Sequence, residues 1–197
     1  MGAITRTLAN NITTGGVILP SGINNTSISN VTSLPAGVGG KVLQVVSATK
    51  TDTQTYTQST VRADITGLSV TLTPASTSNK ILVGFKVSHW GNDSHCQIER
   101  SIGGGAYSII FSPSGVTGST TSTHSGGSHR SIYELNTATM EVLDSPNTTS
   151  SITYKITFNN GPGTGSAGYV NRASDLNTAD ANSEQGISTI TAMEIAG

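Results

Sequence analysis

Two segments of this chain alternate apolar and mostly polar positions with a period of two residues, and this alternation limits the folds open to it. The residues on the apolar faces are Ile81, Val83, Phe85 and Val87 in the first segment and Ile152, Tyr154, Ile156 and Phe158 in the second. A period of two is typical of a half-buried β-strand, whereas an amphipathic helix repeats about every 3.6 residues. The sequence therefore predicts an all-β protein, an antiparallel β-sandwich of the jelly-roll type.

Apolar segments recur at short intervals from Lys41 onward, as they do in sandwiches and barrels. The run Gly103-Gly104-Gly105 predicts a hairpin loop, because glycine adopts positive φ freely. Two long polar stretches, 112–130 and 159–185, are candidate contact surfaces, since loops of this length are usually functional or stabilised by a partner. The expected strands are 41–49, 53–58, 61–73 with a break at Gly67, 80–89, 95–102, 106–112, 131–143 with an interruption, 151–158 and 187–195.

The first 40 residues differ from the rest, because paired Asn and Gly residues interrupt every apolar group before it forms a long element. Two alternatives are a flexible leader and an extended arm that lays its apolar side chains on a neighbouring subunit. We favour the arm, since a disordered tail is poorer in apolar residues. The predicted division is an N-terminal arm for assembly or anchoring, 1–40, and a β-sandwich domain, 41–197. The expected arm anchors are Ile4, Leu8, Ile12, Val17, Ile18 and Leu19.

Charge and hydropathy exclude several partners. The net charge of −1 and the pI near 6.4 leave no basic stripe for phosphates, so we expect no nucleic-acid binding. No apolar run reaches the roughly 18 residues of a membrane span, and the N-terminus lacks the pattern of a signal peptide. We therefore expect a chain that is soluble as made, without membrane insertion. The single cysteine, Cys96, excludes an internal disulfide and favours stabilisation by packing and subunit association.

Candidate reaction chemistry is sparse. His89, His95 and Cys96, with Asp93 between them, have residue types that suit zinc, but neighbouring residues 95 and 96 face opposite sides of a strand. We therefore predict no metal site and no cofactor, and interpret these side chains as a small apolar cysteine and two histidines at a loop edge.

Catalytic patterns give little more. The chain has many serines and histidines such as His124 and His129, but no Gly-x-Ser-x-Gly turn between a strand and a helix. The acids show no spacing that enforces the carboxylate pair of a glycosidase. They are Glu99, Glu134, Glu141, Asp144, Asp175, Asp180 and Glu184. We predict that the protein is not an enzyme.

Four aromatic side chains are candidate contacts for a receptor, a carbohydrate or a subunit interface, because amphipathic rings stack on sugars and anchor interfaces. They are Trp90, Tyr107, Tyr133 and Tyr169. The alternative is that these rings cover the ends of the sandwich core. Tyr154 is expected in the core.

Four segments stand out: GKVLQVVSATKTD at 40–52, TGLSVTLTP at 66–74, SNKILV at 78–83 and ITAMEIAG at 190–197. Together they resemble a module of virion proteins of tailed bacteriophages, common in cyanophages and other aquatic phages, which are made in the host cytoplasm. The leader ITRTLANNIT at 4–13 is also similar to the start of such proteins. The resemblance covers about 40–197 and implies a β-sandwich in a phage virion, assembled as a homotrimer or another symmetric oligomer.

The sequence thus favours a non-enzymatic structural protein at the surface of a phage particle. The first alternative is a short tail fibre or receptor-binding appendage, acting as a homotrimer and meeting a host surface glycan or protein. The second is a capsid decoration protein that stabilises the head, which the short leader favours. In both, the arm binds another virion protein, of the tail or the major capsid shell. A remote third alternative is a polysaccharide depolymerase.

Overall fold

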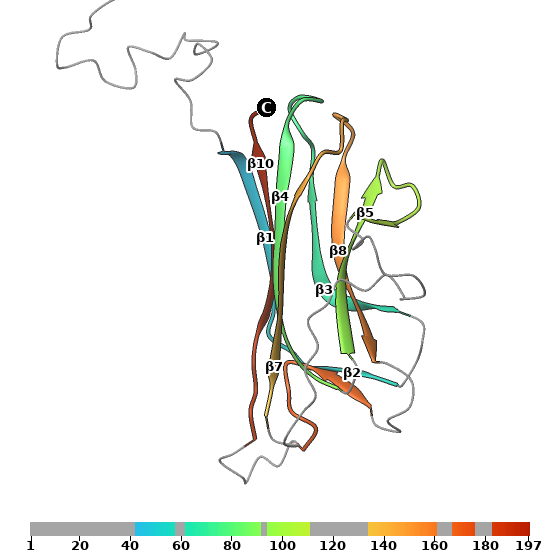
Figure 1. Ribbon diagram of the computed structural model, residues 1–197, viewed down its shortest axis with the longest axis vertical. Coiled ribbons are helices and arrows are strands. Elements are labelled where there is room, and N and C mark those ends of the chain that lie inside the picture. The colour runs from blue at the N-terminus through green and yellow to red at the C-terminus, as the bar shows by residue number, and fades with distance from the viewer. Residues whose placement is uncertain (1–41, 58–61, 92–93, 111–133, 161–166, 176–182) are drawn as a thin grey trace, which may run out of the picture. The chain divides into compact units, whose positions relative to one another are not determined.

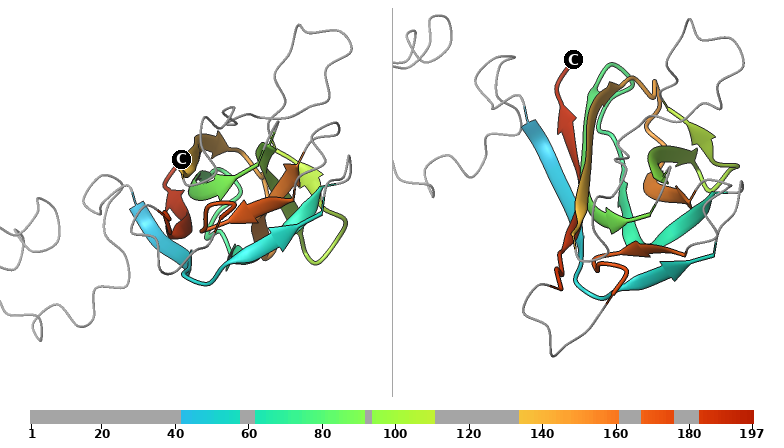
Figure 2. Two further views of the ribbon diagram at one scale, coloured as in Figure 1. Left: turned by 90° about the horizontal axis from the view of Figure 1, so that it is seen from below. Right: turned by 60° about the horizontal axis from the view of Figure 1, so that its bottom comes forward.

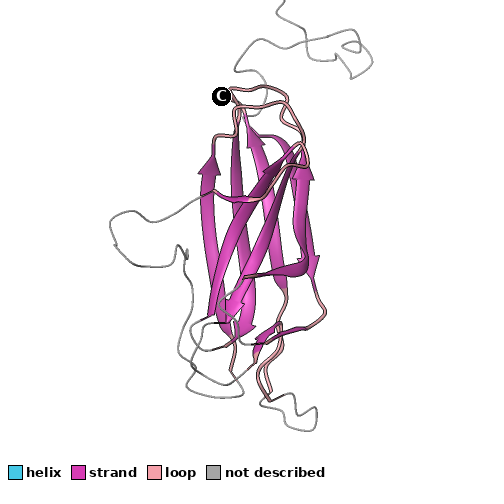
Figure 3. Cartoon of the chain, turned by 90° about the vertical axis from the view of Figure 1, so that its right-hand side faces the viewer, coloured by secondary structure: helices cyan, strands magenta, loops and turns pink. Residues whose placement is uncertain are grey.

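The computed structural model describes residues 42–57, 62–91, 94–110, 134–160, 167–175 and 183–197. All of its regular elements within these ranges are β-strands, which confirms the predicted all-β class (Figure 3). No helix long and apolar enough to cross a membrane occurs in this part of the chain. The ten strands are β1 (Val42–Lys50), β2 (Gln54–Tyr56), β3 (Ala63–Leu72), β4 (Lys80–Trp90), β5 (Ser94–Ile102), β6 (Ser108–Ile109), β7 (Asn136–Asp144), β8 (Ile152–Asn160), β9 (Gly168–Val170) and β10 (Ser188–Ile195).

The strands form two antiparallel sheets that pack face to face (Figures 1 and 2). In sheet A, β10 lies between β1 and β4, and β7 pairs with the other side of β4. The short strands β2 and β9 pair with each other and continue this sheet, because β9 also pairs with the end of β4. Sheet B has the order β3-β8-β5-β6. The strands β1, β10, β4 and β7 facing β3, β8, β5 and β6 have the strand order of a jelly roll, as predicted.

The predicted strands agree with the structure except at a few places. The expected break at Gly67 is a bulge within β3, because Gly67 has φ 86° and the register shifts between Asp64 and Ser69. The expected strand 106–112 contains only the two residues of β6 among those described, and β7 begins at Asn136 rather than at residue 131. Strand β9 was not expected, because it lies in a stretch interpreted as a long loop.

Of two further predictions, the structure confirms the glycine hairpin loop and does not describe the N-terminal arm. The glycine hairpin loop is confirmed, since β5 pairs with β6 and both Gly103 and Gly104 have positive φ. The predicted arm, 1–40, with all its expected anchors, lies outside the described residues, as does Tyr133. The division into arm and sandwich therefore stays a prediction.

The core lies between the sheets and is built by the predicted alternation. All eight residues of the two predicted apolar faces are buried, and Tyr154 is fully inaccessible to solvent. Ile190 and Ala192 of β10 complete the layer on the sheet A side, and Ile65, Leu68 and Val70 of β3 on the sheet B side. Ile65 and Leu68 are three residues apart and would face opposite sides of a regular strand. Because the bulge at Gly67 adds one residue between them, both point into the core, and β3 stays amphipathic on either side of the bulge.

Three polar side chains join the sheets at one end of the core. Arg100 of β5 places its Nη1 at 2.7 and 2.8 Å from the two carboxylate oxygens of Asp144 in β7, and the Tyr154 hydroxyl donates to Asp144 Oδ2 at 2.7 Å. Burial, and then the hydrogen bond to Asp144, raise the pKa of Tyr154. Because the carboxylate accepts from groups of sheet B while lying in sheet A, this cluster fixes the two sheets at that end.

Asn171 follows β9 and lies where β9 gives way to β10 beside β4, and where β2 gives way to β1 in the next position of sheet A. It is 1% exposed and has φ 64°. Its Nδ2 donates to the carbonyls of Lys50 and Asp52, both at 2.9 Å, and its Oδ1 accepts from Ser188 Oγ at 2.6 Å. Its backbone N–H donates to the Ser88 carbonyl at 2.8 Å. One side chain therefore links the β1–β2 junction to the start of β10, and its backbone joins both to β4.

A second buried polar group, Glu194, fixes the opposite end of β10. Its carboxylate accepts from Asn79 Nδ2 and Gln44 Nε2, both at 2.5 Å, and from the backbone N–H of Ala75 at 2.7 Å. Burial alone would raise the pKa of Glu194, but these hydrogen bonds outweigh it and hold the pKa below its usual value of 4.5.

We predict that Asn171→Ala destabilises the protein far more than Asn147→Ala. Asn147 also has positive φ, 51°, but it is exposed, so its replacement costs only the left-handed conformation, about 1–2 kcal/mol. Asn171→Ala adds about 1–3 kcal/mol for each buried group left without a partner. Urea unfolding of both variants measures the difference, and equal losses would contradict the linking role of Asn171.

The second prediction concerns pH. Because the pKa of Glu194 is lower in the folded than in the unfolded chain, its stabilisation is complete above the unfolded value and is lost as the pH falls through the folded value. Glu194→Gln should therefore lower the free energy of unfolding by about 2 kcal/mol at pH 7 and have a smaller effect near pH 3. Urea unfolding across this pH range is the measurement. Glu134→Gln, at an exposed site, is the control, with an expected change below about 0.5 kcal/mol.

Candidate interaction surface on the outer face of sheet A

The outer face of sheet A, the side away from sheet B, carries side chains in rows across its strands. The register of β1, β10, β4 and β7 aligns one residue of each strand in every row. The apolar row consists of Val45, Met193, Leu82 and Leu143. The hollow row consists of Ser47, Thr191, Gly84 and Glu141. The lysine row consists of Thr49, Thr189, Lys86 and Thr139.

The apolar row is exposed at both edges of the sheet. Val45 at the β1 edge is 56% exposed and Leu143 on β7 is 58% exposed, while Met193 and Leu82 between them are half-buried. Leu43 and Ile195 adjoin this row on the side away from the hollow row. A contiguous apolar patch of this kind on a protein surface is typical of a contact site for another molecule.

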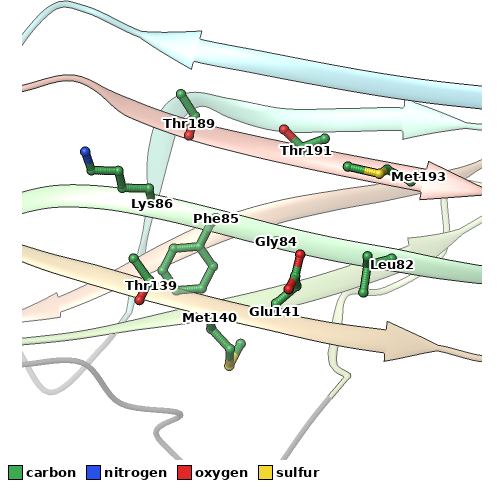
Figure 4. Close-up of a pocket in the computed structure, with 10 residues that line it drawn as sticks. All are labelled: Leu82, Gly84, Phe85, Lys86, Thr139, Met140, Glu141, Thr189, Thr191 and Met193. Carbon is green, nitrogen blue, oxygen red and sulfur yellow. The ribbon is translucent and has the colours of Figure 1, made fainter.

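The hollow row owes its depression to Gly84, which has no side chain in the middle of the sheet. The hollow has a volume of about 580 Å³, and Figure 4 shows Thr191, Gly84 and Glu141 across it, with Met193 and Leu82 on one side and Thr189, Lys86 and Thr139 on the other. Lys86 and Glu141 form no ion pair with any described residue. The hollow is therefore bordered by hydroxyls, two charges and the apolar row, which suits the docking of a surface better than a reaction.

The edge of sheet A next to these rows is also open to pairing. Strand β1 is an edge strand of sheet A and carries no charged residue from Val42 to Thr49. Its pairing with β10 shifts register between Val42 and Gln44 and is continuous from Gln44 to Lys50. Edge strands of soluble proteins usually carry charges, bulges or little length to prevent pairing with other chains. The other four edges conform, because β7 carries Glu141 and Asp144, β3 has its bulge, and β2 and β6 have only three and two residues.

The structure brings two of the four candidate aromatic residues together. Trp90 and Tyr169 are paired in register at the end of β4, with ring centroids 5.8 Å apart, and the Arg172 guanidinium lies 3.7 Å from the Tyr169 ring centroid. Trp90 is 6% exposed, so it is placed as a core-covering ring. Tyr107 lies apart, over sheet B, with Lys155 Nζ at 3.9 Å from its ring centroid.

The candidate metal ligands do not converge in the described residues. Cys96 is fully buried, and burial raises the pKa of its thiol, while His95 next to it is half-buried. His89 is fully buried against the Phe158 ring rather than at a loop edge, which corrects that part of the prediction. Asp93 lies outside the described residues, and no group of three metal-ligating side chains occurs within them.

A serine and a histidine do meet, at a place not predicted from the sequence. Ser94 Oγ lies 3.0 Å from His89 Nδ1 and also donates to the Gly91 carbonyl at 3.0 Å. Both side chains are fully inaccessible, so no substrate reaches the hydroxyl. This contact therefore satisfies buried polar groups at the start of β5. The two histidines considered for catalysis, His124 and His129, lie outside the described residues.

Three carboxylates, two on sheet B and one at the end of β7, form ion pairs with basic side chains. Lys155 Nζ lies 2.7 Å from Asp64 and 3.5 Å from Glu99, and Arg100 contacts Asp144. These three acids therefore serve as ion-pair partners within the fold.

The apolar row was missed from the sequence, although a signal for it exists. In Ile81-Leu82-Val83, Val45-Val46 and Val142-Leu143 an apolar residue stands where the alternation calls for a polar one. Each exception is unremarkable within one strand, because isolated exposed apolar residues are common. Only the register of four strands from distant parts of the chain aligns them.

Comparisons with known proteins leave the family open. No protein-family model and no curated protein matches the sequence. Among solved structures, the crystal structure of the infectious bursal disease virus VP2 subviral particle is similar over 78% of this chain and 37% of that chain, with 11% identity and a TM-score of 0.38. The structure of the Gx strain of the same virus is similar over 78% of this chain and 38% of that chain, with 12% identity and a TM-score of 0.35. The chain thus spans well under half the length of these structures.

The aromatic placements give a third prediction. Trp90→Ala should lower the free energy of unfolding by about 3–5 kcal/mol, because it removes a large buried side chain. Tyr107→Ala should cost about 1 kcal/mol or less, since this ring is 43% exposed and mainly covers Lys155. Chemical denaturation measures both. If Trp90→Ala unfolds like the native protein, Trp90 does not cover the core.

Proposed function

We propose that this protein is a non-enzymatic structural component of a virus particle, which works through contacts between protein surfaces. The observation that carries the proposal is the apolar row on the outer face of sheet A, next to an uncharged edge strand. Burial of apolar surface contributes about 25 cal/mol per Å², so such a face favours association over solvation. The ion pairs of Asp64, Glu99 and Asp144 and the inaccessible Ser94 agree with a role other than catalysis.

The finer proposal is a short tail fibre or receptor-binding appendage of a tailed phage, assembled as a homotrimer. It rests on the resemblance of 40–197 to modules of such proteins. A symmetric oligomer multiplies weak contacts with a host glycan or protein, because binding of one copy raises the effective concentration of the others. In this arrangement the arm, 1–40, binds a tail protein, and the edge strand β1 accepts a strand from a neighbour.

A second candidate is a capsid decoration protein, in which the sandwich and the arm bridge subunits of the head. The uncharged edge of β1 and the adjacent apolar row favour it, because two contact surfaces on one unit can join two neighbours. A tail appendage needs only one such attachment.

The location in the particle distinguishes these roles, and its measurement is the fourth prediction. For a tail appendage we expect tens of copies or fewer per purified virion, with immunogold label at the tail. A decoration protein would give hundreds of copies and label over the head. Absence of the protein from purified particles would overturn the proposal as a whole. Cleavage of host polysaccharide by the isolated protein would favour the depolymerase alternative.

A further inference from the structure

We propose that a second copy of this chain packs face to face on the outer face of sheet A, around a twofold axis that runs parallel to the strands between β10 and β4. This inference goes beyond the proposed function, because it assigns a partner to this face and does not depend on where the protein sits in a virion. It is an alternative to the homotrimer implied by the resemblance, because a closed twofold contact joins two copies and the two assemblies have different masses.

The argument begins with the order of the strands. An axis parallel to the strands keeps each row opposite itself and reverses the order β1-β10-β4-β7. Strand β1 then faces β7 of the partner, and β10 faces β4 of the partner. The face is therefore complementary to itself if, in each row, the β1 residue can pack against the β7 residue of the partner. The β10 residue must likewise pack against the β4 residue of the partner.

The apolar row meets this condition at both positions. Val45 lies opposite the partner's Leu143, and Met193 lies opposite the partner's Leu82. All four contacts formed by the two copies are apolar, and they cover the exposed side chains at both edges of the sheet. Their burial supplies the attraction.

The hollow row is complementary to itself in shape and in hydrogen bonding. Thr191 lies opposite the partner's Gly84 and faces the hollow, where Glu141 Cγ stands 3.4 Å from the position that a Cβ on Gly84 would take. Ser47 lies opposite the partner's Glu141, and its hydroxyl can donate to that carboxylate. In the lysine row Thr189 lies opposite the partner's Lys86. No two charges of the same sign stand directly opposite each other, and the net charge of −1 per chain gives little overall repulsion.

The expected contact is small. Four strands spaced about 4.8 Å apart and seven residues of β4 at about 3.3 Å each define roughly 440 Å² per copy, or roughly 900 Å² in total. Interfaces of this size belong to the weak, concentration-dependent class. The strands of the two copies should run nearly aligned at the axis, within the range of aligned sheet packings.

The test uses the full chain and chemical cross-linking. One copy carries Val45→Cys and a second, differently tagged copy carries Leu143→Cys, and a short bismaleimide spans the roughly 10 Å between packed sheets. The native Cys96 is fully buried and adds little background. We expect the mixed pair to cross-link at least about tenfold faster than two controls, in which the thiols lie roughly 17 Å apart. The controls are Val45→Cys alone and Val45→Cys mixed with Thr139→Cys.

Sedimentation gives an independent readout. The native chain should reach twice its 20.1 kDa mass at concentrations up to about 1 mM. The double substitution Val45→Lys with Leu143→Lys should remain monomeric while keeping its circular dichroism spectrum, because both side chains are more than half exposed in one copy. A monomer at all concentrations, a trimer, equal cross-linking rates in the controls, or a dimer that survives the double substitution would each overturn the proposal.

Discussion

The hydrogen bonds of Asn171 hold together the sheet on which the outer face depends. Strands β10 and β9 pair with the same side of β4, one after the other along it. Strands β1 and β2 lie outside them in the same way, β1 beside β10 and β2 beside β9. Both strand positions of the sheet therefore have a gap at the same height along β4. At such a level the backbone groups lose their ladder partners and must be satisfied by side chains or other backbone groups. Asn171 does this with one amide and a left-handed backbone, which asparagine tolerates better than most residues. Register on the two sides of the interruption therefore stays coupled.

The register in turn determines the chemistry of the outer face. A shift of one residue in β10 would turn Met193 and Thr191 inward and expose Ile190 and Ala192. Glu194 opposes such a shift, because its carboxylate must stay with Asn79, Gln44 and the Ala75 backbone. Polar groups at the two ends of β10 thus specify one alignment, while the apolar core supplies most of the stability. In a chain whose only cysteine is free, this division of roles replaces covalent cross-links.

The sequence was sufficient for features that depend on neighbouring residues. The alternation in β4 and β8 predicted two strands and their buried faces, and the run of three glycines predicted the β5–β6 hairpin. It was insufficient where partners lie far apart in the chain. Strand β9 has three residues and exists because β2 and β4 supply its partners, about 115 and 80 residues earlier. Gly67 was interpreted as a break for a similar reason, since only β8 shows that the strand continues beyond the bulge.

The apolar row also depends on residues that lie far apart in the chain, which explains why the sequence did not predict it. Aromatic residues were the natural candidates, because each ring is conspicuous by itself. Trp90 and Tyr169 in fact contact each other at the end of β4, whereas the apolar row contains no aromatic residue. Its four members come from strands separated by up to about 150 residues, and each is an ordinary aliphatic side chain. A surface of this kind gains its specificity from alignment rather than from any single group. For a protein whose proposed role is assembly, that is an advantage, since the same register that stabilises one copy also positions the side chains that meet the next.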